Sequence, residues 1–336
     1  PYIIQWLMLT SGKTANNKIF SSDYWQQKYK WAYENHLPFE KLDSLTCDQN
    51  TVFQKWIQHP EMDSYWKSIL PDEEDYSSID IPILSITGHF DADQPGALHY
   101  YNNHMEYGSD ESKDDHHLII GPWTHHGTRN PTTSLKGLEF GENSVIDMNE
   151  LYLQWFDWTL KNGPKPGILK DRIMTYVMGL NEWKYASTIE ELGIYNRKFY
   201  LTSARNPTSN PQILGGLLAN PDYESEKPDT LIYDPAALAG LDYFAEKLVA
   251  PQDYTDTNYI HRPNTVLFET DPLEEDIEIN GKITVTAYLS ITTPDTDLEI
   301  SLYELTPSGE SIFLEGDIIR ARYRNSLEKA VPVEAG

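Results

Sequence analysis

The chain has 336 residues, with 26 lysines and arginines against 52 aspartates and glutamates, so its formal net charge at pH 7 is −26. Such a negative field repels phosphate backbones and anionic lipid, so we expect no nucleic-acid partner and no membrane contact, and we interpret the acidity as a solvating surface. Aromatic residues make up 12% of the chain, which excludes a disordered polymer, and the length is enough for two folded domains.

Residues 1–80 carry large apolar side chains at helical spacing. The pattern includes Tyr24, Trp25, Tyr29, Trp31, Tyr33, Phe53, Trp56, Ile57, Tyr65, Trp66 and Ile69. Three prolines interrupt it, at positions 38, 60 and 71. The apolar start of the chain is too short to span a bilayer. We therefore predict several short helices that form a cap or lid.

The pattern changes at residue 81. Two apolar runs, at 81–87 and 116–120, are rich in β-branched residues, as buried parallel strands are. Helical periodicity follows each of them, over 95–107 and 145–161. Strand, helix, strand and helix in succession indicate βαβ units in a parallel sheet. We therefore predict an α/β fold with residues 81–168 in its core.

Helical periodicity is lost beyond residue 170. Short candidate strands recur instead, separated by clusters of Pro, Gly, Asn and Asp, at residues 173–178, 198–202, 265–269, 282–292, 298–305 and 311–314. Residues 203–262 are rich in Asn, Pro, Asp and Tyr, which predicts long loops. We therefore assign residues 169–336 to a β-sandwich, which we expect to be incomplete because residues 332–336 show no closing strand.

An acid and a histidine follow the two predicted core strands. Asp91 comes after the first strand, and His125 comes after the second, 34 residues later. Because the carboxyl ends of parallel strands open into one crevice, we expect both side chains to face it. A carboxylate there accepts from Nδ1–H of the imidazole while Nε2 takes the proton of a serine. The sequence therefore indicates the acid and the base of an acyl-transfer triad.

The nucleophile of such a triad has no match. No Gly-x-Ser-x-Gly turn occurs in the 336 residues. In α/β-hydrolases the serine comes first, then the acid, then the histidine, which puts the serine before Pro1. We therefore expect a piece of a hydrolase that does not turn over esters by itself. Labelling of this chain at one serine by a fluorophosphonate, with activity lost in His125→Ala, would contradict that expectation.

A metal-dependent hydrolase remains open as an alternative, because seven of the ten histidines lie between residues 89 and 126. The candidate ligands are Asp91, Asp93, His89, His125 and His126. No His-x-His pair or His-Glu-x-x-His helix is present, and a calcium loop that starts at Asp91 would lack its glycine and glutamate. We therefore assign no metal and no cofactor.

The remaining histidines and the single cysteine are interpreted structurally. His116 and His117 lie in the second core strand, where packing or hydrogen bonding is the expected role. His99 and His104 are five residues apart on a predicted helix, so they face different sides and form no joint ligand pair. Cys47 has no Cys or His beside it at metal spacing, and we expect an unreactive thiol.

Four stretches together resemble the family of X-Pro dipeptidyl-peptidase-like serine hydrolases, to which ester hydrolases and acylases also belong. They are HPEMDSYW at 59–66, TGHFD at 87–91, GPWTH at 121–125 and GDIIRARYR at 316–324. The resemblance covers nearly the whole chain. It implies a helical cap over 1–80, the C-terminal part of an α/β-hydrolase core over 81–168, and a jelly-roll β-sandwich over 169–336.

By this resemblance Asp91 is the triad acid and His125 the triad base, whereas the family's serine turn and oxyanion tyrosine have no counterpart here. In its amino acid ester hydrolases, acidic residues two and three positions after the acid help hold the substrate ammonium. Those positions are Asp93 and Gln94, so one carboxylate is kept. Asp93 is thus a candidate substrate ligand, with a helix cap as the alternative. Trp123, like the cap tryptophans 25, 56 and 66, is assigned to the substrate pocket or to core packing.

The predicted function is therefore acyl transfer, through an acyl-enzyme, on a small ester, an amide or a short peptide. A non-catalytic β-sandwich binding module is the alternative of a different class. The resemblance favours a periplasmic or secreted protein, while the sequence itself leaves the compartment open. The oligomeric state, a homo-oligomer included, is open as well.

Overall fold

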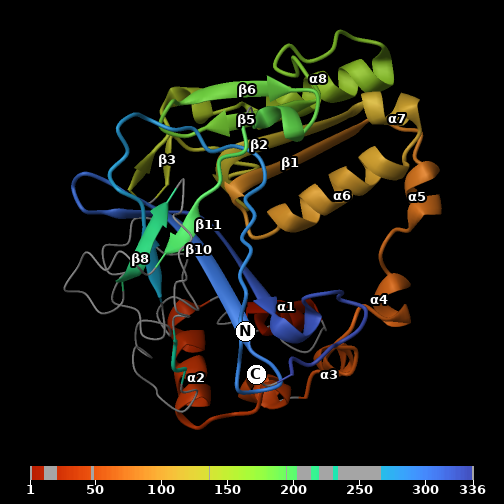
Figure 1. Ribbon diagram of the computed structural model, residues 1–336. Helices are drawn as coiled ribbons and strands as arrows, with labels where there is room; N and C mark the ends of the chain where they lie inside the picture. The colour runs from red at the N-terminus through yellow and green to blue at the C-terminus, as the bar shows by residue number, and fades with distance from the viewer. Residues whose placement is uncertain are drawn as a thin grey trace. The chain divides into compact units, whose positions relative to one another are not determined.

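The computed structural model describes most of the chain, namely residues 2–10, 21–46, 49–135, 137–193, 195–202, 213–218, 230–233 and 266–334. Cys47 and most of the loop region expected at 203–262 lie outside the described residues. The chain divides into two compact units (Figure 1). Unit 1 comprises residues 1–66, 199–272 and 290–336, and unit 2 comprises residues 67–198 and 273–289.

Short helices make up the N-terminal part of unit 1, as the aromatic spacing predicts. They are α1 (Tyr2–Thr10), α2 (Ser22–Glu34), η2 (Phe39–Thr46), α3 (Thr51–Ile57) and α4 (Ser64–Lys67). Asn50 starts α3, because its side chain accepts hydrogen bonds from the backbone N–H groups of Val52 and Phe53. Among the described residues, no helix combines the length and the apolar character needed to cross a membrane.

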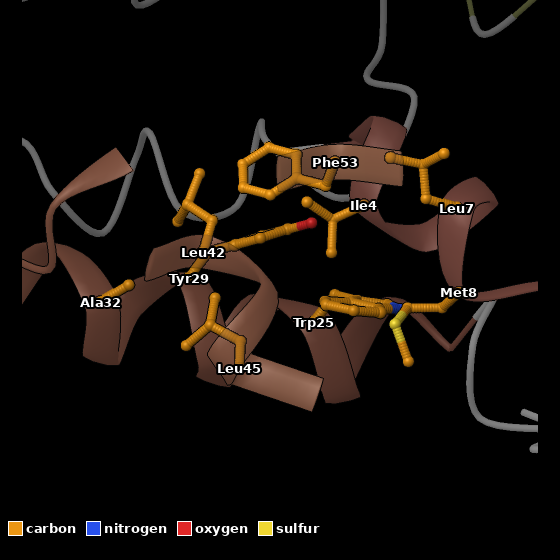
Figure 2. Close-up of a cluster of buried hydrophobic side chains, with 9 residues drawn as sticks. All are labelled: Ile4, Leu7, Met8, Trp25, Tyr29, Ala32, Leu42, Leu45 and Phe53. Atoms are coloured by element: carbon orange, nitrogen blue, oxygen red, sulfur yellow. The ribbon is translucent and has the colours of Figure 1, made fainter. Parts of the chain in front are cut away.

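These helices bury one shared apolar cluster (Figure 2). Trp25 and Tyr29 of α2 stack with their ring centroids 5.4 Å apart, and each is 1% exposed. Around them lie Ile4, Leu7, Met8, Ala32, Leu42, Leu45 and Phe53. Burial of each large side chain contributes about 1.5–3 kcal/mol, which holds together helices that are too short to be stable alone. Trp25, one of the cap tryptophans considered for a substrate pocket, is therefore a core residue of unit 1.

The strands of unit 1 form two small sheets. One contains β7 (Tyr200–Thr202), β8 (Ile213–Leu218) and β9 (Leu267–Glu269), and the other is an antiparallel hairpin of β10 (Asp297–Leu305) and β11 (Ser311–Arg320). The strands β7, β9, β10 and β11 confirm four of the segments that the alternating pattern predicts.

Two predictions for this half of the chain are wrong. β8 lies within the region for which loops were expected, because its two central glycines hide the strand pattern. Residues 282–292 form no strand. Their alternating side chains remain exposed, Val285 at 49% and Tyr288 at 98%, and no strand among the described residues pairs with them. A half-buried strand needs a pairing edge and an apolar surface to cover, and the described residues offer this segment neither.

Within unit 1, the loop at Pro60 is tied to the C-terminal segment. The hydroxyl of Tyr323, in η6 (Ala321–Tyr323), donates to the Pro60 carbonyl at 2.8 Å. The backbone N–H of Ala330 donates to the carboxylate of Glu61 at 2.8 Å. Two of the stretches that carry the family resemblance therefore meet in the fold.

A four-stranded mixed sheet forms the centre of unit 2, in the order β1-β2-β5-β6 (Figure 1). Its strands are β1 (Ile83–Phe90), β2 (His116–Thr124), β5 (Ile173–Val177) and β6 (Glu182–Ala186). The first three are parallel, and β6 is antiparallel to β5. The strand pattern at residues 173–178 predicts membership of the sandwich, but β5 pairs with β2 instead. Ile173 and Met174 of β5 are fully buried, because the strand lies inside this sheet.

Helices and short elements complete unit 2. They are α5 (Glu73–Ser77), α6 (Gln94–Tyr107), α7 (Asp110–Asp114), η3 (Glu142–Ser144), α8 (Met148–Lys161) and η4 (Glu190–Leu192), with the two-stranded ribbon of β3 (Ser134–Leu135) and β4 (Leu138–Glu139). α6 and α8 confirm the two predicted helices. The N-terminus of α8 is capped by Asp147, whose side chain accepts from the backbone N–H of Glu150 at 3.1 Å.

The alternation of β2 places α6 and α8 on opposite faces of the sheet. Leu118 and Ile120 pack with Tyr101 of α6, whereas Ile119, between them in sequence, packs with Leu151 of α8. Successive side chains of a strand point to opposite faces, so one strand anchors both helix layers. The chain is therefore an α/β protein with a β-rich C-terminal part, as the sequence predicts.

Candidate active site

The strands that lead to the candidate residues run in register until their carboxyl ends. Gly88 of β1 pairs with Gly121 of β2, but the next pair is Phe90 with Thr124. β2 thus has one residue more than β1 over this step, which is a β-bulge. The bulge brings the residues that follow the two strands side by side.

Trp123 lies in this bulge and explains the glycines around it. Its side chain is 2% exposed, and Nε1 donates to the Ser144 carbonyl at 3.2 Å. A Cβ on Gly88 would lie 2.0 Å from the carbonyl oxygen of Trp123, and a Cβ on Gly121 would lie 2.3 Å from its indole ring. Only glycine fits at both positions without a shift of the backbone. Trp123 is buried in the core and does not line the pocket described below, so the structure favours its packing interpretation.

Asp91 and His125 meet where β1 and β2 end. Nδ1 of His125 lies 3.2 Å from Oδ1 of Asp91, whose side chain is only 5% exposed. Two further groups fix this carboxylate. The backbone N–H of Asp93 donates to Oδ1 at 3.0 Å, and the hydroxyl of Thr87 donates to Oδ2 at 3.5 Å. Asp91 is therefore held in one orientation, aimed at the imidazole.

Asp93 supplies a second carboxylate to the same nitrogen. Its Oδ2 lies 3.2 Å from Nδ1 of His125, and its side chain is 77% exposed. Asp93 stands at the N-cap position of α6, but its side chain makes no capping hydrogen bond. The predicted N-cap position is therefore confirmed, whereas a capping hydrogen bond from the side chain is not. The predicted contact of Asp93 with a substrate ammonium stays a proposal.

The neighbours of His125 determine which of its nitrogens carries the hydrogen. Both side chains at Nδ1 are carboxylates, which only accept, so Nδ1 carries it. The group at Nε2 is the guanidinium of Arg129, with Nη2 at 3.3 Å. A guanidinium only donates, so Nε2 presents its lone pair. A neutral imidazole in this tautomer is suited to act as a general base through Nε2.

A pocket of about 350 Å³ opens beside this pair. Apolar and aromatic side chains form part of its wall, namely Leu84, Ile86, Ala97 and Tyr152. The polar side chains are Thr87, Asp91, Asp93, His125, Thr128 and Arg129. All of them belong to unit 2. The pocket therefore combines a partly apolar wall with a cluster of charged groups, as sites for small molecules do.

Seven of the ten lining residues were not predicted from the sequence, and four of these carry polar atoms: Thr87, Thr128, Arg129 and Tyr152. A signal was present for two of them, because residues three and four positions after His125 lie on the same side if the chain turns helically. It does so, since the N–H of Thr128 donates to the Thr124 carbonyl at 3.1 Å. Tyr152 gave no local signal, because it reaches the pocket from α8.

The other histidines near β2 make structural contacts. Nδ1 of His116 lies 2.9 Å from Nδ1 of His104, and both side chains are fully buried. Burial lowers the pKa of His116 to about 3 and the pKa of His117 to about 4. Burial also lowers the pKa of His89, whose Nε2 donates to the Tyr176 carbonyl at 3.1 Å. The packing interpretation of His116 and His117 is confirmed.

Three of the five candidate metal ligands come together. One ligand atom each of Asp91, Asp93 and His125 lies within 4.8 Å of the others. His89 and His126 bond elsewhere, to a backbone carbonyl and to an asparagine amide. An ion bound by the three would replace the hydrogen on Nδ1, which already has two carboxylate acceptors. Hydrogen bonding therefore accounts for the cluster without a metal.

Two family models match the chain. The model of the X-Pro dipeptidyl-peptidase (S15 family) matches residues 1–127, which include both Asp91 and His125. The model of the X-Pro dipeptidyl-peptidase C-terminal non-catalytic domain matches residues 172–336. The two matches follow each other along the chain and leave residues 128–171 between them.

One relative is similar in sequence, and two solved structures are similar in fold. The cocaine esterase of Rhodococcus sp. (strain MB1 Bresler) is 26% identical over 293 residues, which are 85% of this chain and 48% of the esterase. The crystal structure of an aminopeptidase from the marine sediment archaeon Thaumarchaeota archaeon has a TM-score of 0.64 at 19% identity, over 91% of this chain and 51% of that one. An α-amino acid ester hydrolase labelled with selenomethionine has a TM-score of 0.64 at 20% identity, over 90% and 52%. The chain shares this fold and spans about half the length of these relatives.

Proposed function

Because this chain belongs to the X-Pro dipeptidyl-peptidase (S15) family of serine hydrolases, we propose that Asp91 and His125 are the acid and the base of its acyl-transfer site. One observation carries the proposal: Nδ1 of His125 meets the buried carboxylate of Asp91 at 3.2 Å. The substrates we propose are small esters, amides or short peptides, whose acyl group passes to a serine and then to water.

In this mechanism, Nε2 of His125 accepts the proton of the serine hydroxyl while the oxygen attacks the acyl carbon. His125 then returns that proton to the leaving group. The imidazolium that exists between these steps is stabilised by the carboxylates at Nδ1. Asp91 contributes most to this, because its side chain is removed from water and fixed by hydrogen bonds.

We propose that the serine comes from residues that precede this chain. The chain contains no Gly-x-Ser-x-Gly turn, and the order in α/β-hydrolases puts the serine before the acid and the histidine. The relatives are about twice as long. The 336 residues then supply the acid and the base, and turnover awaits the segment with the serine.

The test uses the complete hydrolase, defined as this chain together with the residues that precede it in its reading frame. The kcat/KM for 4-nitrophenyl butyrate is compared among wild type, His125→Ala and His126→Ala. His125→Ala should lower it by about 10³–10⁴-fold, because the general base is lost. His126 is the matched control: it is exposed and contacts the Asn130 amide, so its removal should cost less than about twofold.

Retention of activity in His125→Ala to within about tenfold would refute the assignment of the base. The position of the nucleophile is tested separately with a fluorophosphonate probe and mass spectrometry. The complete hydrolase should be labelled at one serine upstream of Pro1. A stoichiometric label on any serine of the 336 residues would contradict the proposed position.

The exposed carboxylate of Asp93 lines the pocket, and it supports a preference for substrates that carry an ammonium group. Asp93→Asn should raise the KM for an amino acid ester and leave the KM for its N-acetylated form unchanged, because only the first has a charge to pair. Equal KM changes for both esters would remove Asp93 from substrate binding.

The cluster of Asp91, Asp93 and His125 supports a second candidate, a metal-dependent hydrolase. Metal analysis of the purified complete hydrolase distinguishes the two. One equivalent of zinc or manganese, with activity lost on chelation and restored by the ion, would favour the second candidate. Full activity without bound metal would leave the serine mechanism alone.

A further inference from the structure

Arg129 is a pocket residue whose contact does not balance its charge. Its Nη2 lies 3.3 Å from Nε2 of His125. Among the described residues it has no carboxylate partner, whereas Arg172 binds Asp114 and Arg320 binds Asp297. The chain has twice as many acidic as basic residues, so carboxylates are plentiful for arginine to pair with. Arg129 is thus an uncompensated cation on the wall of the pocket.

The contact of Arg129 opposes the proposed mechanism as long as it lasts. The guanidinium donates to the lone pair of Nε2, which is the lone pair that must accept the proton of the serine. Once His125 is protonated, two positive groups face each other, and their repulsion disfavours the imidazolium. Catalysis therefore requires that the guanidinium leave Nε2 or that its charge be neutralised.

We propose that Arg129 recognises a carboxylate of the substrate, and that this carboxylate draws the guanidinium away from Nε2 of His125. The proposal rests on the proposed function and names a substrate class for the same site: esters or amides that carry an anionic group near the scissile bond, with or without the ammonium group proposed for Asp93. A planar guanidinium binds a carboxylate through two parallel hydrogen bonds, a stronger contact than one to a neutral imidazole.

The charges around the pocket confine such a carboxylate to one side. Asp91 and Asp93 occupy the Nδ1 side of His125 and repel an anion there. Arg129 lies on the Nε2 side, where the reacting atoms meet. A substrate carboxylate is therefore directed to the side of the imidazole that exchanges the proton, and its presence releases the base.

The kinetic test compares two substrates of the complete hydrolase that differ by one charge: 4-nitrophenyl hemisuccinate and its methyl ester. The variants are Arg129→Gln and Arg129→Lys. Arg129→Gln should lower kcat/KM for the hemisuccinate by about tenfold to a hundredfold, which is the loss of a charged hydrogen bond. It should raise kcat/KM for the methyl ester by about threefold, because the competitor for Nε2 is gone. Arg129→Lys keeps the charge and should retain part of the preference.

Arg320→Gln is the control for removal of a guanidinium, since Arg320 already binds Asp297. Arg320→Gln should leave kcat/KM unchanged for both substrates. If Arg129→Gln changes kcat/KM by the same factor for both substrates, the ratio of the two values stays as in wild type. That outcome would show a merely structural role for Arg129 and would overturn the proposal. A wild-type enzyme that hydrolyses neither ester contradicts the proposed function instead, and the binding test below then decides the role of Arg129.

The binding test uses this chain as it stands, labelled with nitrogen-15 in its histidines. Succinate and the uncharged succinamide are added up to about 50 mM, enough to fill a site with a millimolar Kd. Succinate should shift the imidazole signals of His125 in wild type but not in Arg129→Gln, and succinamide should shift neither. The absence of a shift in wild type, or equal shifts in both proteins, would overturn the proposal.

Discussion

β2 has histidines at both of its ends, and the two ends treat them in opposite ways. At the amino end, His116 and His117 are buried, and their pKa values fall to about 3 and about 4. Beyond the carboxyl end, His125 is 56% exposed and has two carboxylates at Nδ1. The residue type is the same, so the surroundings decide the chemistry. A dry site holds imidazole neutral, whereas the ring of His125 lies in contact with water and with two carboxylates.

The amino end is closed by hydrogen bonds between neutral groups. His116 and His104 approach through their Nδ1 atoms at 2.9 Å, and Nε2 of His116 lies 2.9 Å from the hydroxyl of Ser85. One hydrogen serves the contact between the two rings. A hydrogen on both Nδ1 atoms would put two N–H groups face to face in the core, so the two rings cannot both be protonated while this packing lasts. At His125 the two groups at Nδ1 are acceptors, and Arg129 donates at Nε2.

The largest effect should come from Asp91, which defines the carboxyl end. Asp91→Asn replaces the buried carboxylate, which only accepts, by an amide that can donate to Nδ1 and so allows the other imidazole tautomer. The kcat of the complete hydrolase should then fall by about 10³–10⁴-fold. The measurement is kcat for 4-nitrophenyl butyrate, with circular dichroism to show that the fold is retained. A folded Asp91→Asn protein with the kcat of wild type would show that the carboxylate of Asp91 does not set the chemistry of His125.

The amino end should reveal itself through the pH dependence of stability. The pKa of His117 is about 4 in the fold against 6.5 as the ordinary value. Above pH 6.5 His117 is neutral in the folded and in the unfolded chain, so it does not lower the free energy of unfolding there. Between 6.5 and 4 the unfolded chain binds a proton that the folded chain does not, so the free energy of unfolding should fall by about 3 kcal/mol for this residue. His116 acts in the same direction.

Urea unfolding followed by tryptophan fluorescence, at about pH 7, 5.5 and 4.5, measures this slope. His117→Phe should make it shallower, because the proton-binding group is absent from the unfolded chain. His126→Phe is the matched control on the exposed neighbour of His125 and should leave the slope as in wild type. Equal slopes in both variants would show that His117 is not held neutral.

Gly88 tests the bulge that sets the carboxyl end apart. Gly88→Ala places a Cβ 2.0 Å from the Trp123 carbonyl oxygen, and the overpacking should cost about 1–3 kcal/mol of stability. Gly96→Ala is the control, since a Cβ there meets nothing within 4 Å. Gly96 lies inside α6, so alanine should stabilise by about 0.5–1 kcal/mol. Loss of stability in Gly96→Ala and not in Gly88→Ala would reverse the argument.

The smallest effect should come from Asp93. Its carboxylate shares Nδ1 of His125 with Asp91, but its side chain is 77% exposed, so water screens the contact. Asp93→Asn should lower kcat for an uncharged ester by less than about fivefold, as surface ion pairs contribute about 1 kcal/mol or less. A loss as large as that of Asp91→Asn would make the two carboxylates equal partners of the base.

Local pattern predicted the elements that build the core of unit 2, because β1, β2, α6 and α8 each repeat their period over a sufficient length. It failed where a partner strand decides the outcome. β5 joins β2 across a long separation in sequence, and residues 282–292 have no partner strand in the part of the chain that the structure describes. The spacing of apolar residues within a strand does not show which distant strand it pairs with.

The site divides in the same way. Asp91 and His125 follow parallel strands, and the rule that carboxyl ends share a crevice was enough to bring them together. The contacts of Asp93 and Arg129 depend on the course of the chain after the strands, which the bulge at Trp123 sets. No periodicity announces a bulge, and its glycines become understandable only once the position of Trp123 is known.

The central claim is that Asp91 orients His125 so that Nε2 presents the lone pair of the proposed base, and the tautomer of His125 tests it most directly. Nitrogen-15 spectra of this chain, assigned with His125→Ala, distinguish the two neutral tautomers. The account predicts that Nδ1 carries the hydrogen and Nε2 does not, and that Asp91→Asn raises the population of the other tautomer. A His125 that carries its hydrogen on Nε2 in the wild-type chain, unaffected by Asp91→Asn, would contradict it.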